Sequence, residues 1–114
     1  MRSYNSLGQM IIDLPNLEAG EWIYANTESW CRKPEDAKFY YIPWDYLQSL
    51  DDDQIYLDDQ DMEFPLQVHG FGLRSWMLVS SLLYILANKV AGGHDTGWFI
   101  DEINYYREND TFRT

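Results

Sequence analysis

The chain has 114 residues and a formal net charge of −11; 46% of its residues are apolar and 17% are aromatic. This amount of apolar and aromatic material excludes an intrinsically disordered chain, and the length is typical of a single domain. The strong negative charge argues against direct binding to nucleic-acid phosphates or to anionic membranes, because both require Lys and Arg. Cys31 is the single cysteine, so an intrachain disulfide is excluded.

The first predicted element is a short helix that begins after Ser6. Apolar residues follow Ser6 at helical spacing, and the serine can cap the helix. Pro15 disfavours helical backbone in the residue before it, so the helix is expected to end near Asp13. The next part of the chain predicts a β-hairpin. Its strands are residues 21–25 and 38–42, both rich in β-branched and aromatic residues, and the turn formers between them predict a long loop over 26–36.

The middle of the chain is predicted to be mostly irregular. Residues 44–50 are expected to form a short helical turn, and residues 51–63 a mostly exposed acidic loop. Few apolar residues interrupt this acidic segment, which is why no regular buried face is predicted for it. Residues 64–72 contain two glycines and a proline and are expected to be irregular, with room for one helical turn.

The last third of the chain predicts one strand and two helices. Residues 73–79 are expected to form a third strand. The following helix is expected to be capped by Ser80 or Ser81 and to run to about residue 91, where two glycines end it. A final helix over residues 96–108 has Asp95 or Thr96 as its expected cap.

These elements predict the fold class and the number of domains. A small antiparallel sheet of two to four strands packed against about three helices is an α+β fold. No repeat, linker or change in composition divides the sequence. We therefore expect residues 1–114 to form one domain.

The negative charge is concentrated in one part of the chain. Residues 39–73 contain eight acidic residues and no Lys or Arg. Seven of the acids fall within residues 51–63, and aromatic side chains flank them. The candidate partner-binding residues are therefore Asp51, Asp52, Asp53, Asp58, Asp59, Asp61 and Glu63, with Trp44, Tyr46 and Tyr56 as aromatic anchors.

The clustering of these acids favours a binding role over a purely solubilising one. Crowded carboxylates repel one another and destabilise the fold, whereas solubility alone is served by dispersed charges of both signs. A cationic partner relieves the repulsion when it docks. Charges of this kind accelerate association, and aromatic side chains supply contact area in the dry centre of an interface. The simpler alternative is that the acidic segment only keeps the domain soluble.

No motif predicts a catalytic residue, a metal site or a cofactor. The acidic segment fails the EF-hand pattern, because Tyr56 stands at the glycine position and Met62 at the final glutamate position. The two histidines, His69 and His94, lack metal-ligand spacing, and Cys31 has no recognisable catalytic signature around it. We therefore expect a protein that is not an enzyme and carries no cofactor.

Several segments together resemble a known family. They are Trp22-Ile23-Tyr24 followed by Trp30-Cys31, the acidic segment, the apolar stretch 81–90 and the ending Ile103-Asn104-Tyr105-Tyr106-Arg107-Glu108-Asn109-Asp110-Thr111-Phe112. This layout is similar to a family of small acidic domains associated with immunity proteins of bacterial toxin systems, including contact-dependent growth inhibition. The resemblance implies a cognate toxin as partner, commonly a nuclease with a cationic cleft.

These observations lead to one expectation and leave two alternatives open. The expected function is that of a cytoplasmic immunity protein that neutralises a cognate toxin, a basic nuclease, by direct binding. One alternative is an acidic nucleic-acid mimic that inhibits a DNA- or RNA-binding protein. The other is a small metal-dependent enzyme or regulator that uses His69, His94 or Cys31 with carboxylates. The sequence has no apolar segment that suits a signal peptide or a membrane span.

Overall fold

The chain folds into short strands and into helices of between 5 and 14 residues. The computed structural model describes residues 1–113, and this part contains six strands, five α-helices and four 3₁₀ turns. The strands are β1 (Arg2–Tyr4), β2 (Trp22–Ala25), β3 (Phe39–Tyr41), β4 (Ile55–Leu57), β5 (Glu63–Pro65) and β6 (Arg74–Leu78). The helices are α1 (Leu7–Asp13), α2 (Thr27–Arg32), α3 (Trp44–Gln48), α4 (Val79–Gly92) and α5 (Thr96–Asn109), and the 3₁₀ turns are η1 (Leu14–Asn16), η2 (Pro34–Asp36), η3 (Asp52–Gln54) and η4 (Leu66–Val68).

The central sheet has four antiparallel strands in the order β1-β3-β2-β6. Strands β2 and β3 pair as expected, with Ile23 opposite Tyr41, and β6 supplies the expected third strand. The expected α+β class is therefore confirmed. The pairing of β2 with β6 is interrupted by a bulge, since Ile23 faces Met77 and Tyr24 faces Ser75, which leaves Trp76 as the extra residue.

The two faces of the central sheet bury different clusters. Alternation along β2 directs Ile23 and Ala25 into the larger cluster, where both are fully buried. Helices α1, α4 and α5 pack on this side and contribute eight of the nineteen buried residues of the cluster. We call this cluster the main core; its largest members are Trp30, Phe39, Trp76 and Phe99.

A smaller cluster lies between the central sheet and the segment that links β3 to β6. We call it the hairpin core; its buried members are Ile42, Phe64, Val68 and Leu73. Tyr24 of β2 packs edge-on against Phe64 with the ring centroids 5.3 Å apart, which joins the second sheet to the first. The hairpin core therefore anchors the acidic part of the chain on the rest of the protein.

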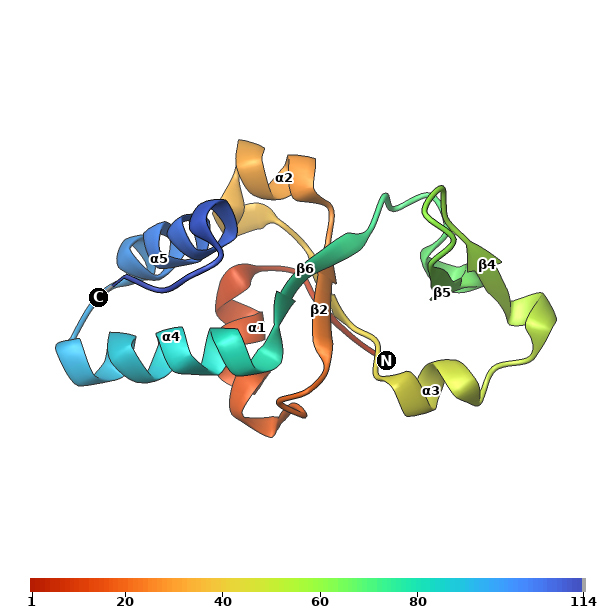
Figure 1. Cartoon of the computed structure of the whole chain (residues 1–114), viewed down its shortest axis with the longest axis horizontal. Helices are drawn as coiled ribbons and strands as arrows, with labels where there is room; N and C mark the ends of the chain where they lie inside the picture. Colours follow the sequence, from red (N-terminus) through yellow and green to blue (C-terminus); the bar gives the residue numbers. More distant parts are fainter. Residues whose placement is uncertain (114) are drawn as a thin grey trace.

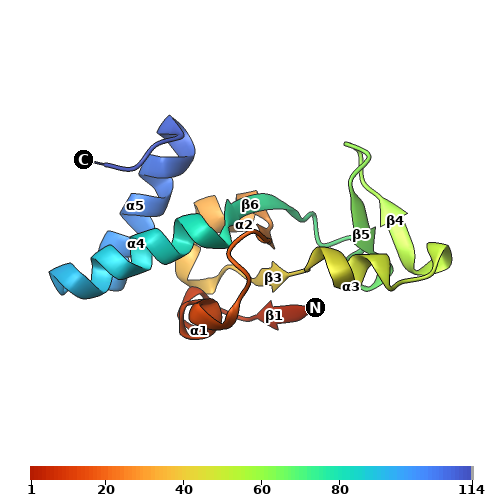
Figure 2. The same ribbon diagram turned by 60° about the horizontal axis from the view of Figure 1, so that its bottom comes forward.

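The molecule is elongated, with extents of 46 × 27 × 24 Å. Helices α4 and α5 lie toward one end of the long axis, whereas α3, β4 and β5 lie toward the other end (Figures 1 and 2). Among residues 1–113, no helix has the length and apolar character that a membrane crossing requires.

Three of the predicted helix ends are confirmed. Ser6 caps α1 by accepting a hydrogen bond from the N–H of Gln9, Asp95 caps α5, and Gly93 ends α4 in the left-handed conformation with φ = 65°. The predicted cap of α4 is wrong, because the helix begins at Val79, before either serine. Backbone carbonyls of the loop before β2 replace a side-chain cap: the N–H of Val79 donates to the Glu21 carbonyl at 2.9 Å and that of Ser80 to the Ala19 carbonyl at 3.0 Å.

In the part of the chain that forms the central sheet and its helices, strand β1 and helix α2 were not predicted. Strand β1 has three residues and exists because β3 pairs with it. Helix α2 lies where a loop was expected; Asn26 caps it by accepting from the N–H of Ser29. Its Trp30 is 1% exposed, and the indole N–H donates to Asn104 of α5 at 2.8 Å. Both elements are too short to be stable alone, so tertiary contacts determine them.

The largest correction concerns residues 51–63, which are mostly exposed as expected but form a 3₁₀ turn and strands where a loop was predicted. Asp51 precedes turn η3, and β4 then pairs with β5 in a second antiparallel sheet of two strands. Tyr56 lies opposite Phe64, and both rings pack into the hairpin core. We call residues 51–65 the acidic hairpin.

Candidate functional site

The turn of the acidic hairpin is built around the carboxylate of Asp58. Its Oδ1 accepts hydrogen bonds from the N–H groups of Gln60 and Met62 at 2.8 and 2.9 Å. Asp61 adopts the left-handed conformation with φ = 60°, which Asp tolerates better than most residues. The side chain of Asp58 and the left-handed backbone of Asp61 thus allow the chain to reverse direction between the two strands.

Arg74 ties this turn to the central sheet. Its guanidinium donates to Oδ2 of Asp58 at 3.1 Å and to Oδ1 of Asp59 at 2.8 Å. The side chain of Asp58 is only 8% exposed, whereas that of Asp59 is 72% exposed. Asp58 is therefore a structural residue of the turn, and we remove it from the expected partner-binding set.

We expect the substitution Asp58→Asn to change the acid sensitivity of the protein. The backbone N–H of Met62, followed by that of Gln60 and the charge of Arg74, holds the pKa of Asp58 below its usual value. Stability from this group is therefore present above the unfolded-state pKa of aspartate, about 4, and is lost as the pH falls through the lower folded-state pKa. Urea unfolding at pH 7 and pH 3 measures this effect.

In that experiment, the variant should lose less of its free energy of unfolding between pH 7 and pH 3 than the native protein loses. Asp52→Asn is the matched control, because Asp52 is exposed and is absent from the ion pairs among residues 1–113. An Asp58→Asn profile that parallels the native one would contradict the structural role of this carboxylate.

The other acids of the hairpin lie on its surface. Asp51, Asp52 and Asp53 surround turn η3, where the side chain of Gln54 accepts from the N–H of Asp51 at 3.1 Å. At the other end of β4, Asp59, Asp61 and Glu63 are exposed around the hairpin turn. Strand rise places the two groups ~15 to 20 Å apart. The acids therefore form two clusters on one hairpin.

The three expected aromatic anchors differ in exposure. Tyr56 packs inward, with its ring centroid 5.8 Å from that of Phe64 and 4.8 Å from that of His69. Tyr46 packs against the hairpin core, and its hydroxyl accepts from Gln67 at 2.8 Å. Trp44 is 61% exposed at the start of α3. Only Trp44 presents a largely exposed aromatic surface.

Sequence reasoning missed an exposed apolar residue between the two acidic clusters. Leu57 is 59% exposed and pairs with Glu63 across the hairpin. Because side chains alternate along a strand, the inward direction of Tyr56 directs Leu57 outward. Treating residues 55–57 as a strand would have revealed this residue. Leu66 and Phe71 are further exposed apolar residues in the same part of the chain.

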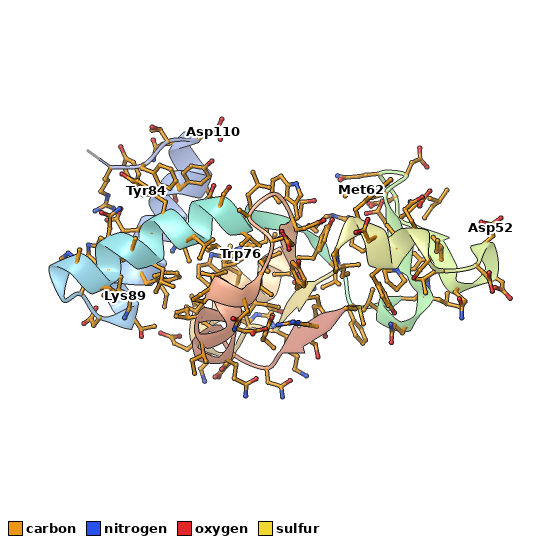
Figure 3. The ribbon with its side chains drawn as sticks, turned by 90° about the horizontal axis from the view of Figure 1, so that it is seen from below. Asp52, Met62, Trp76, Tyr84, Lys89 and Asp110 are labelled. Atoms are coloured by element: carbon orange, nitrogen blue, oxygen red, sulfur yellow. The ribbon has the colours of Figure 1, made fainter. Side chains whose placement is uncertain are left out.

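The acidic hairpin lies far from the lysine of α4. Asp52 stands at one end of the long axis and Lys89 near the other (Figure 3). Arg74 forms ion pairs with two acids of the hairpin, Asp58 and Asp59, and both lie at the turn. We define the hairpin surface as Asp51, Asp52, Asp53, Leu57, Asp59, Asp61 and Glu63.

The residues considered for catalysis lie on separate elements. His69 follows η4, Cys31 is exposed on α2, and His94 follows α4 and stacks on Trp98 at 4.1 Å between ring centroids. Within residues 1–113, no group of three or more His, Cys, Asp or Glu residues is placed to hold a metal ion.

A hollow of about 470 Å³ lies between α4, α5 and the residues after α5. Its ionisable side chains are Tyr84, His94, Glu102 and Arg113, and Arg113 lies 3.6 Å from Glu102 as an ion pair. The carboxylate of Glu102 in this hollow is therefore paired with a guanidinium of the same chain.

Comparison with protein-family models, with curated proteins and with solved structures gives no match for this chain.

Proposed function

We propose that this protein is an immunity protein that neutralises a cognate toxin, a basic nuclease, by docking its hairpin surface on the cationic cleft of the enzyme. The observation that carries the proposal is the acidic hairpin itself. It protrudes at one end of an elongated molecule, and two clusters of exposed carboxylates flank the exposed Leu57.

The chemistry of the hairpin surface suits such a partner. A nuclease binds phosphate groups with Lys and Arg, so carboxylates at similar positions compete for the same cations. Leu57 supplies apolar contact between the clusters, and Trp44 supplies more at the other end of α3. Steering by unpaired charges accelerates capture of the partner, which is what an inhibitor of a harmful enzyme requires.

The pairing of β4 with β5 gives the hairpin surface a defined shape. Tyr56 and Phe64 hold the inner side on the hairpin core, and Arg74 fixes the turn. A surface ordered before binding loses less conformational entropy when it docks. The acids are thus presented by a positioned element, which favours tight, stoichiometric inhibition in the cytoplasm.

The direct test uses the protein encoded by the gene immediately upstream. We expect the two purified proteins to form a 1:1 complex by size-exclusion chromatography, and co-expression to restore growth that the upstream protein alone prevents. Absence of both complex and protection would refute a cognate-toxin role for that pair. Capture of general DNA-binding proteins, with no effect of the upstream gene, would indicate the nucleic-acid mimic instead.

A further inference from the structure

The acidic hairpin has a strand edge that faces away from the rest of the molecule. Within residues 1–113, β4 pairs with β5 alone, and the two strands form a sheet of their own. Helix α3 contacts β5, whereas β4 lies farther out along the long axis in both views of the ribbon (Figures 1 and 2). The outer edge of β4 is therefore open to a further strand.

The register of the hairpin shows which backbone groups lie on this edge. The N–H of Asp58 donates to the Met62 carbonyl at 3.0 Å, so these two residues form a hydrogen-bonded pair. Hydrogen-bonded and non-hydrogen-bonded pairs alternate along an antiparallel ladder, so Leu57 belongs to a non-hydrogen-bonded pair. Ile55 belongs to the next pair of the same kind, and its partner Pro65 has no N–H to donate, which agrees with this register.

The outer edge of β4 thus presents three backbone groups. Residues of a non-hydrogen-bonded pair direct their N–H and C=O away from the strand they pair with. Leu57 therefore contributes a donor and an acceptor. Ile55 contributes a second acceptor only, because its N–H already donates to the Asp52 carbonyl. Leu57 is 59% exposed, so another chain can approach these groups and pair with them as an added strand.

The charges beside this edge determine which strand can be added. Of the acids on the hairpin surface, three lie before β4 and three lie around the turn that follows it, on either side of Leu57. A second copy of the hairpin would bring like charges together, so the acids oppose pairing between two copies of this chain. A strand with an apolar residue at its centre and Lys or Arg toward its ends complements both the apolar side chain and the carboxylates.

We propose that an extended basic segment of the partner adds to the outer edge of β4 as a third strand of this sheet. Its backbone pairs with Leu57 and Ile55. Side chains alternate along a strand, so basic residues two positions before and after its centre lie on one face, ~13 Å apart, and their long side chains reach the two acidic clusters. The inference rests on the proposed function for the identity of the partner as a toxin, whereas the edge can be tested by itself.

The first test uses the full chain and the peptide acetyl-Lys-Thr-Val-Thr-Lys-amide at low ionic strength. Titration in ¹H–¹⁵N correlation spectra measures affinity, and hydrogen exchange measures the protection of single amides. Exchange of the Leu57 N–H should slow by about tenfold or more at saturation, as one added hydrogen bond gives. The N–H of Glu63 points to the opposite edge of the hairpin and should exchange at an unchanged rate. A peptide with Glu in place of both Lys should bind about tenfold more weakly or less tightly still.

Two variants at one position separate the backbone from the side chain. Leu57→Pro removes the outward N–H, which the pairing of β4 with β5 does not use, and should weaken peptide binding by about tenfold. Leu57→Val keeps this N–H and an apolar side chain, so its affinity should stay within about twofold of the native value. Protection of the Tyr56 amide, which pairs with Phe64, shows whether the hairpin of Leu57→Pro is intact. The exchange experiment on the native protein requires no variant.

Three results would overturn the proposal. They are unchanged exchange of the Leu57 amide in the presence of the peptide, protection of Glu63 in its place, and equal affinity of Leu57→Pro and Leu57→Val.

The same variants, mixed with the protein encoded upstream, separate this inference from the proposed function. If that protein binds both variants as tightly as it binds the native chain, docking uses side chains alone; strand addition is then wrong and the immunity role is retained. If it does not bind the native chain, the proposed function is wrong for that pair, and the peptide experiment still decides whether β4 accepts a basic strand.

Discussion

If the proposed toxin docks on the hairpin surface, the triple substitution Asp52→Asn, Asp53→Asn and Asp61→Asn should slow its association by about tenfold or more at low ionic strength. These acids are exposed and belong to neither ion pair of Arg74. Removing three negative charges weakens long-range steering, so the on-rate should fall while the dissociation rate changes less. The dependence of the on-rate on salt should also become shallower. Stopped-flow mixing or surface plasmon resonance over a salt series measures both effects.

The matched control removes the same amount of charge elsewhere. Glu35, Asp101 and Glu108 are exposed residues outside the acidic hairpin, and none belongs to an ion pair among residues 1–113. Their triple neutralisation gives the same net charge as the hairpin triple variant. If both triple variants bind at the same rate, total charge and not the hairpin surface controls association, and the interface must be sought elsewhere.

Phe64→Ala should have the largest effect on stability among the hairpin variants. Phe64 is 1% exposed and contacts the rings of Tyr24 and Tyr56, which join the two sheets. Truncation of a buried Phe typically costs about 3–5 kcal/mol. Because the hairpin core is small, we expect β4 and β5 to open before the central sheet does. Urea unfolding measures the free energy, and hydrogen exchange shows which strands lose protection.

Phe71→Ala is the control for that experiment. Phe71 is 47% exposed and lies in the connection between the acidic hairpin and β6, so its loss should cost about 0.5 kcal/mol or less. Equal losses for the two variants would contradict the role of the hairpin core. Equal loss of protection in β2 and β4 of Phe64→Ala would show that the two cores unfold as one unit.

The local signals in the sequence were reliable where one segment contains all the necessary information. Ser6 and Asp95 have side chains that can cap a helix, and apolar residues at helical spacing come directly after each of them. Gly93 supplies the left-handed residue that ends α4. The strands over residues 21–25 and 38–42 follow from β-branched and aromatic content. These features depend on neighbours in sequence, so composition and periodicity are sufficient to predict them.

The errors occurred where distant residues decide local structure. Helix α2 depends on burial of Trp30 and on Asn104, which lies 74 residues away. The start of α4 depends on carbonyls of residues 19 and 21. The acidic segment was expected to be a loop because it has few apolar residues. In the structure, Tyr56 packs against Phe64 across a turn that Asp58 and Arg74 stabilise. No local pattern contains these partners.

The sequence by itself determined the α+β class, the location of the charge and the acidic residues of the candidate site. These properties follow from residue types and short-range spacing. Only the tertiary structure decided how these side chains are used: it hydrogen-bonds Asp58 within the turn, pairs Asp59 with Arg74, exposes Leu57 and turns Tyr56 inward. The physical reason is that burial and pairing depend on which surfaces meet in the fold, and surfaces that meet here are separated by many residues in the chain.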